Sequence, residues 1–258
     1  MTKGRIKAAA AAIITAAMLS GLVPSVYADN TAIGYGQGTA ADSSNCPVDA
    51  VSFDQNYRKY NAYATTPDRQ RIIITFDQGY ENGYTADILD TLKEKNVKAI
   101  FFLTGDYAKK EQELVKRMID EGHVIGNHGM KHASLPKLSY DEAVNEISSL
   151  HDYVKDTYGY EMTLFRPPCG EYSERALATA QSLGYKTLLW SFAYCDWDVN
   201  AQPDCAEALE RVTTAGHNGA IYLLHSVSST NCEILPEVID SLRAQGYEFS
   251  LPFNTSIS

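Results

Sequence analysis

Basic residues are scarce in this chain, and their scarcity restricts its partners. The 258 residues include 22 Lys and Arg against 32 Asp and Glu, a formal net charge of −10 at pH 7. Proteins that bind nucleic acid or anionic lipid depend on basic clusters that release counterions. The composition therefore argues against both as partners, whereas a neutral or cationic glycan remains compatible with the chain.

The sequence also lacks an uninterrupted apolar run long enough to cross a membrane. An Ala-rich segment follows a basic start, but Ser20, Gly21 and Pro24 interrupt it, below the roughly 20 apolar residues that a span needs. A basic start, an apolar run and a small-residue end at Ala28 are typical of a secretory signal peptide. We predict cleavage after Ala28 and export without stable membrane insertion, with an uncleaved anchor as the alternative. The mature chain would carry 19 basic and 32 acidic residues, a net charge of −13.

Disulfide bonding is restricted by the number of cysteines. Five are present, so at least one thiol is free or pairs with another chain. Cys195 and Cys205 are the nearest pair along the chain, but the sequence does not determine the connectivity.

About 230 residues remain after the signal peptide, enough for one domain with a sizeable core. Residues 29–48 are rich in Gly, Ala, Ser, Thr and Asn, which predicts a flexible leader. For residues 49–70 we predict an N-terminal wrap, a segment that packs against the main domain. We assign residues 71–258 to the main domain.

In the main domain, short β-rich runs alternate with amphipathic stretches, the pattern of βαβ units and a parallel sheet. Ser139 and Glu142 predict a capping box at the start of one helix. No Gly-rich phosphate loop follows the first strand, which disfavours an open nucleotide-binding sheet. The fold class is therefore α/β, and a barrel of seven or eight strands is the natural closure. The predicted strands span 72–76, 99–103, 123–125, 163–165, 187–190 and 220–224.

Polar side chains stand at or just after the ends of these predicted strands. In a β/α barrel the carboxyl ends of the strands form one rim, where catalytic groups collect. A carboxylate there can act as general base, a histidine as general acid, and two histidines four residues apart can hold a Lewis-acid metal. These are the roles that amide or ester hydrolysis requires. The residues at the strand ends are Asp77, His128, Arg166, Asp196 and His225, and His132 is the second histidine of the pair.

Each of these residues also has a simpler explanation. Asp77 could cap the following turn, and His225 could be a buried core histidine. Arg166 could be a surface residue in a rigid proline turn, and Asp196 with Trp197 could form a packing corner. The spacing of His128 and His132 is not rare by chance. The inference therefore depends on the set rather than on any member.

Five motifs in order resemble those of the polysaccharide deacetylase family, which carries the NodB homology domain and forms carbohydrate esterase family 4. They cover about residues 70–250. Residues 80–85 and 219–228 further resemble the delta-lactam-biosynthetic de-N-acetylases, which act on peptide-free N-acetylmuramic acid of the spore cortex. The resemblance implies a distorted (β/α) barrel and a site at the cell wall or spore envelope. The motifs are Thr75–Tyr80, His128–His132, Arg166–Gly170, Asp196–Trp197 and Leu224–His225.

The resemblance implies a role for each matching position. Asp77 matches the base that activates water, and His225 matches the acid that protonates the departing amine. Arg166 would orient the base and Asp196 would tune the acid. His128 and His132 match metal ligands. The remaining matches, to substrate or oxyanion contacts, are the backbone amide of Cys169, Tyr80 and Trp197.

Gln78 departs from the family pattern, which has a metal-binding aspartate at this position. A neutral amide oxygen binds a divalent ion less strongly than a carboxylate does. We therefore expect a weakly bound divalent ion, zinc or another transition metal, held mainly by the two histidines, with Gln78 as a doubtful ligand.

Two alternatives follow from the same residues. The enzyme could deacetylate another glycan, such as peptidoglycan N-acetylglucosamine, chitin oligomers or xylan. Alternatively, the Gln78 substitution and the abundant tyrosines could belong to a catalytically weakened glycan-binding protein.

Overall fold

The computed structural model describes residues 27–67 and 70–251. The predicted signal peptide lies outside these residues, apart from Tyr27 and Ala28. Among the described residues, no helix combines the length and apolar character needed to cross a membrane.

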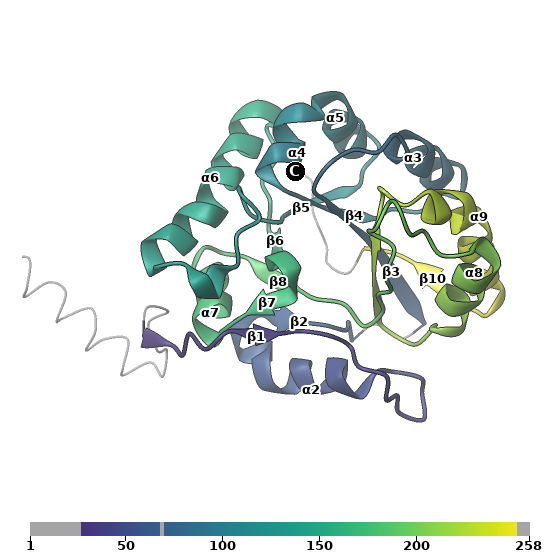
Figure 1. The fold of residues 1–258 in the computed structure, drawn as a ribbon, viewed down its shortest axis with the longest axis horizontal. Helices are drawn as coiled ribbons and strands as arrows, with labels where there is room; N and C mark the ends of the chain where they lie inside the picture. The colour runs from purple at the N-terminus through teal and green to yellow at the C-terminus, as the bar shows by residue number, and fades with distance from the viewer. Residues whose placement is uncertain (1–26, 68–69, 252–258) are drawn as a thin grey trace, which may run out of the picture.

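Parallel strands form the centre of the molecule (Figure 1). Neighbours in the sheet follow the order β9-β3-β4-β5-β6-β8-β2, and β10 pairs with the first residues of β3. Every ladder in this sheet is parallel. The strands are β2 (Ala62–Tyr63), β3 (Arg71–Gln78), β4 (Ile100–Leu103), β5 (Val124–Asn127), β6 (Leu164–Phe165), β8 (Lys186–Leu188), β9 (Ala220–His225) and β10 (Glu248–Phe249).

The two ends of the sheet approach each other beyond β8. Phe192 and Tyr222 form an isolated parallel bridge, and the Ser191 amide donates to the Ile221 carbonyl over 2.9 Å. The Thr66 amide, beyond β2, donates to the Gly219 carbonyl over 2.9 Å. The strands therefore curl into a distorted barrel, which confirms the predicted fold class.

Helices surround the sheet in the order expected of βα units (Figure 1). The predicted capping box is present: the Ser139 side chain accepts from the Glu142 amide, and Glu142 accepts from the Ser139 amide. The helices of the main domain are α3 (Thr85–Glu94), α4 (Gly105–Lys110), α5 (Gln112–Asp120), α6 (Tyr140–Tyr158), α7 (Glu174–Ser182), α8 (Cys205–Thr214) and α9 (Ser229–Ala244), with short 3-10 turns η3 (Leu135–Lys137) and η4 (Pro168–Gly170).

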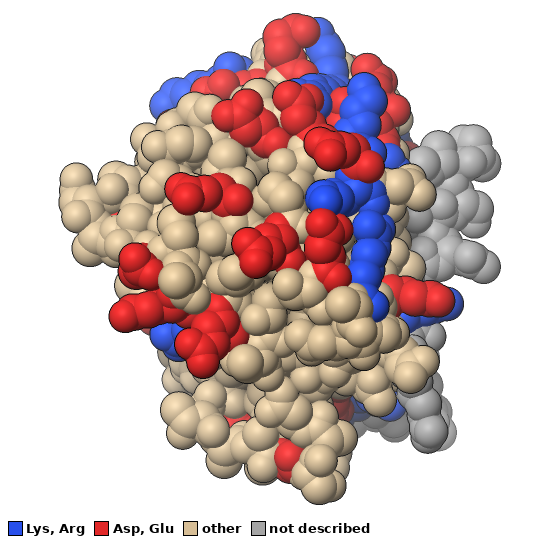
Figure 2. All heavy atoms as spheres, turned by 90° about the vertical axis from the view of Figure 1, so that its right-hand side faces the viewer, with Lys and Arg blue, Asp and Glu red and all other residues tan. Residues whose placement is uncertain are grey.

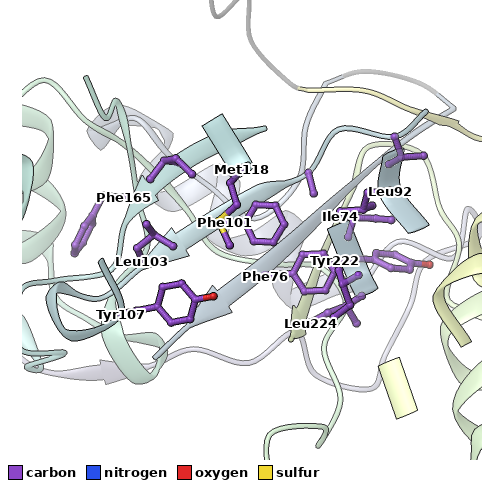
Figure 3. Close-up of a cluster of buried hydrophobic side chains, with 14 of the residues drawn as sticks. Ile74, Phe76, Leu92, Phe101, Leu103, Tyr107, Met118, Phe165, Tyr222 and Leu224 are labelled. Carbon is purple, nitrogen blue, oxygen red and sulfur yellow. The ribbon is translucent and has the colours of Figure 1, made fainter. Parts of the chain in front are cut away.

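Alternation along the strands produces two apolar layers. In β3, Ile72, Ile74 and Phe76 pack toward the helices, whereas Ile73 belongs to a cluster made mainly of strand residues inside the barrel. Figure 3 shows part of the outer layer, in which Phe76 and Phe101 stack with ring centroids 5.2 Å apart. Because both faces are buried, the strands read as continuous apolar runs rather than alternating ones.

The segment predicted as a flexible leader packs against the body of the protein. β1 (Ile33–Gly34) pairs antiparallel with β7 (Glu171–Tyr172). The Tyr35 ring meets the rings of Phe53 and Trp190 edge-on, each at 5.2 Å. Composition did not indicate these contacts, because it counts apolar residues and does not register one aromatic anchor with backbone pairing.

The predicted wrap, residues 49–70, contains α2 (Val48–Tyr57), the 3-10 turn η2 (Arg58–Tyr60) and β2. Since β2 pairs with β8 in the sheet, the sheet begins before Arg71. Asp54 holds α2 to this strand: its carboxylate accepts from the Ala64 amide over 2.6 Å and from the Thr65 hydroxyl over 2.5 Å.

Removing the Asp54 carboxylate should weaken the fold. Asp54→Ala leaves the buried Ala64 amide without its acceptor, so we expect the free energy of unfolding to fall by about 1–3 kcal/mol. Asp49→Ala, an exposed position on the same helix, is the matched control and should change it by less than about 0.5 kcal/mol. Urea unfolding of both variants tests this, and equal losses would contradict it.

Candidate active site

The sequence-predicted site residues gather at the carboxyl ends of the strands. A pocket of about 940 Å³ opens there, within the range of sites that hold a small ligand. Arg166, Asp196 and Gln78 are buried outside its lining. The other predicted residues line it: Asp77, Tyr80, His128, His132, Cys169, Trp197 and His225.

Asp77 and His225 are direct partners in register on the adjacent parallel strands β3 and β9. Residues opposite each other on neighbouring strands project to the same side of a sheet. Both side chains consequently reach the same pocket, although they are 148 positions apart along the chain.

Arg166 forms an ion pair with Asp77 at the base of the pocket. Its side chain is 0% exposed, and its Nη1 lies 2.7 Å from Asp77 Oδ1 and 2.8 Å from Thr75 Oγ1. Nε and Nη2 donate to the carbonyls of Leu188 and Leu189 over 3.0 and 3.1 Å. Burial alone would raise the pKa of Asp77, but the charges of Arg166 and the nearby histidines hold it below its ordinary value.

His128 and His132 lie beside this ion pair. His128 Nδ1 is 2.8 Å from the Arg166 carbonyl, a contact that requires Nδ1 to carry the proton and leaves the Nε2 lone pair free. That Nε2 is 3.2 Å from His132 Nε2 and 3.4 Å from Asp77 Oδ2. Burial lowers the pKa of His128 to about 4, so this ring is neutral at pH 7.

The loop that carries the two histidines is held by Glu146 of α6. Glu146 is buried, and its Oε1 accepts from the amides of Lys131 and Ala133 over 2.6 and 3.1 Å. Gly129 adopts φ +84°, and a Cβ there would come within 2.8 Å of the same carboxylate oxygen. The loop therefore requires glycine at this position.

The two histidines fit a pair of ligand positions for a divalent ion. Both Nε2 atoms are near enough for one ion to contact each at ~2.0–2.1 Å, the usual distance to zinc. Gln78 does not fit a third position: its Oε1 accepts from Ser226 Oγ over 2.6 Å, and the residue does not line the pocket. Across residues 27–67 and 70–251, no group of three or more His, Cys, Asp and Glu is placed to hold a metal.

His225 is paired with a fully buried carboxylate. Asp196 Oδ1 lies 2.7 Å from His225 Nδ1, and Asp196 Oδ2 accepts from the His225 amide over 2.8 Å. Burial alone would lower the pKa of His225, but the hydrogen bond and charge of Asp196 outweigh it and raise the pKa.

The outer wall of the pocket is aromatic. Tyr80 and Trp197 are 52% and 54% exposed, and the Trp197 ring lies 5.9 Å from that of His225. Cys169 adopts φ +58° in the turn after Arg166. Its thiol is exposed, and all five cysteines are unpaired, so Cys195 and Cys205 form no disulfide.

Sequence reasoning missed residues that support the site from distant elements. Asn231, in α9, donates to Asp196 Oδ2 over 2.5 Å and to the His225 carbonyl over 3.1 Å. Tyr194 donates to Asn231 Oδ1. Gln37 accepts from Trp190 Nε1 over 2.9 Å and brings the N-terminal segment to the pocket wall. None of these residues belongs to a motif, so no signal in the sequence indicated them.

Replacing the Asp196 carboxylate should change the titration of His225. Asp196→Asn removes the negative charge that raises the pKa of His225, so that pKa should fall below the wild-type value. NMR titration of the histidine ring signals measures it, with His225→Gln identifying the resonance. Asp198→Asn, an exposed neighbour, should leave the value unchanged. A pKa that is equal or higher in Asp196→Asn contradicts the pairing.

Known proteins resemble this chain in sequence and in fold. The polysaccharide deacetylase family model matches residues 64–188. The peptidoglycan-N-acetylmuramic acid deacetylase PdaA of Bacillus subtilis (strain 168) is 43% identical over 193 residues, covering 74% of this chain and 73% of PdaA. A peptidoglycan-N-acetylglucosamine deacetylase of Bacillus cereus is 34% identical, covering 76% of this chain and 72% of that protein.

The solved structure of PdaA, described as a family 4 carbohydrate esterase, superimposes with a TM-score of 0.81 at 38% identity, covering 86% of this chain and 95% of that one. The sequence similarity spans most of both proteins, and the similarity of fold extends to the curled parallel sheet. The chain therefore belongs to the polysaccharide deacetylase family, the NodB-type enzymes of carbohydrate esterase family 4 that hydrolyse carbon-nitrogen bonds.

Proposed function

We propose that the protein removes the N-acetyl group from N-acetylmuramic acid in peptidoglycan by metal-assisted acid/base hydrolysis. The observation that carries this proposal is the convergence of Asp77, the two histidines and the His225–Asp196 pair on one pocket. The similarity to PdaA supports muramic acid as the substrate.

Asp77 is suited to remove a proton from the attacking water. Its Oδ1 is occupied by Arg166, so Oδ2 remains to accept the proton. Because Arg166 keeps the pKa of Asp77 low, the carboxylate is ionised at neutral pH and available as a base.

His225 is suited to protonate the departing amine nitrogen. Asp196 accepts from Nδ1, which leaves Nε2 as the atom that can face the substrate. Since Asp196 raises the pKa of His225, the ring keeps its proton to higher pH than an isolated histidine would. Without that proton the amide nitrogen would leave as an unstable anion.

The tetrahedral intermediate needs donors for its negative oxygen. Cys169 lines the pocket and adopts a left-handed conformation in its turn, and we assign its backbone amide this role. The side chains of Tyr80 and Trp197 offer exposed aromatic faces to a sugar ring. A divalent ion bound by His128 and His132 would polarise the acetyl carbonyl as a Lewis acid.

N-acetylmuramic acid lies in the cell wall, which agrees with the predicted signal peptide and export. Deacetylation leaves a free amine on the carbon beside the one that carries the lactyl group. In a residue without its peptide, that amine and the lactyl carboxyl are positioned for lactam formation. We therefore propose a role in the formation of muramic δ-lactam in the spore cortex.

Acetate release tests the proposed reaction. Residues 29–258 are incubated with peptide-free glycan strands, and acetate and glycan masses are followed. We expect loss of acetyl from muramic acid, and a decrease in kcat by a factor of about 10²–10⁴ in Asp77→Asn. Asp90→Asn, at an exposed ion pair, should retain activity.

Loss of acetyl from N-acetylglucosamine alone would assign the protein to the other substrate class. Binding of the strands without turnover under any metal would favour the weakened glycan-binding protein. Retention of activity in Asp77→Asn would contradict the assigned base.

Metal dependence is tested separately. His132→Ala should lower affinity for Zn²⁺ by at least about 10-fold, whereas Gln78→Ala should leave it unchanged because the Gln78 oxygen is bound to Ser226. Calorimetric titration of the proteins with Zn²⁺ measures both. If protein shown by elemental analysis to be metal-free deacetylates as fast as metal-loaded protein, the metal has no part in the reaction.

A further inference from the structure

We propose that Lys131 binds the free lactyl carboxylate of N-acetylmuramic acid and thereby makes the enzyme prefer peptide-free muramic acid. This inference rests on the proposed function and specifies its substrate further. It assigns a specificity-determining residue to the loop between the two histidines.

The chemistry of the substrate defines where such a residue must lie. In muramic acid the lactyl ether and the acetamido group are on adjacent ring carbons, so the carboxylate stays within a few ångströms of the scissile amide. N-acetylglucosamine has a hydroxyl in place of that ether, and a peptide converts the carboxylate into a neutral amide. A cation beside the catalytic groups can therefore distinguish peptide-free muramic acid from both.

Lys131 occupies such a position. It lies between His128 and His132 in sequence and lines the same pocket as Asp77 and His225. Its backbone is fixed, because its amide donates to Glu146 Oε1 over 2.6 Å and the Met130 amide donates to the Glu146 carbonyl over 3.0 Å. The side chain itself is exposed. The ammonium group is therefore free to contact the lactyl carboxylate while the backbone stays in place.

The charges around the pocket leave this cation available. The two carboxylates that line it have partners: Asp77 pairs with Arg166 over 2.7 Å, and Asp106 pairs with Lys110 over 2.8 Å. Within the described part of the chain, Lys131 makes no ion pair and is the one lysine or arginine in the pocket lining. It has a weak electrostatic effect on Glu142, whose carboxylate is bound in the capping box of α6.

The charge of the rest of the molecule disfavours an anionic substrate. The chain carries a net charge of −10, and Figure 2 shows acidic side chains over much of one face, with the basic ones mostly in a band to the right of centre. An anionic glycan is repelled by such a protein at long range. An unpaired ammonium in the pocket offsets that repulsion where the carboxylate binds.

Matched substrates test the inference. Peptide-free strands are prepared with free lactyl carboxylates and, in a second batch, with those carboxylates converted to carboxamides. For the wild type, amidation should lower kcat/KM by about tenfold. The effect should fall mainly on KM because the carboxylate is not among the reacting atoms.

Lys131→Met should have the same kcat/KM for the carboxylate and the carboxamide strands. Lys131→Arg should retain part of the preference for the carboxylate strands. Lys116→Met, at an exposed ion pair on α5, should behave as the wild type does. Binding is measured without turnover in the Asp77→Asn background, where adding Lys131→Met should weaken the Kd for carboxylate strands by about tenfold.

The outcomes separate the two proposals. Suppose that the wild type deacetylates muramic acid and that amidation of the strands lowers kcat/KM by the same factor in Lys131→Met as in the wild type. The role of Lys131 is then overturned and the proposed function stands. If the wild type releases no acetate from muramic acid residues, both are overturned.

Discussion

The site depends on one buried ion pair, that between Arg166 and Asp77. A guanidinium with no exposure to water must find acceptors for its donors, because an unpaired buried charge costs several kcal/mol. It finds them in Asp77, Thr75 and the carbonyls of Leu188 and Leu189. Those acceptors belong to β3 and to the end of β8, so the ion pair exists only when the barrel has curled.

The same arginine links Asp77 to the histidine pair. Its carbonyl faces His128 Nδ1 and determines which nitrogen of that ring is free, while its guanidinium determines the charge of Asp77. Asp196 accepts from His225 Nδ1 and so determines which nitrogen of that ring is free. Asn231 donates to Asp196, and Tyr194 donates to Asn231. The anionic form of Asp77 and the protonated form of His225 are thus each favoured by an opposite charge buried behind the side chain. This separation of charge allows two titratable groups to have different tasks in one pocket.

Several parts of this arrangement could be predicted from the chain alone. Polar residues that end apolar β-rich runs predicted the positions of Asp77, His128 and His225, because parallel strands bring their carboxyl ends to one rim. The capping box at Ser139 followed from local chemistry that acts over one helical turn. Other parts could not be predicted. Glu146 and Asn231 act on loops far away in sequence, and nothing at their own positions indicates the partner. The packing of Tyr35 on Phe53 and Trp190 likewise joins three separate segments.

The amino-acid sequence by itself determined the order of βα units, the residue types at the strand ends and the family to which their motifs belong. These features are local, or depend on periodicity, and so can be read without knowing which segments meet. The tertiary structure alone decided that the Gln78 amide binds Ser226 instead of joining the histidines, and that the segment at residues 29–48 forms part of the pocket wall. Both outcomes depend on contacts across the barrel, where burial and hydrogen-bond geometry select among partners that the sequence leaves equivalent.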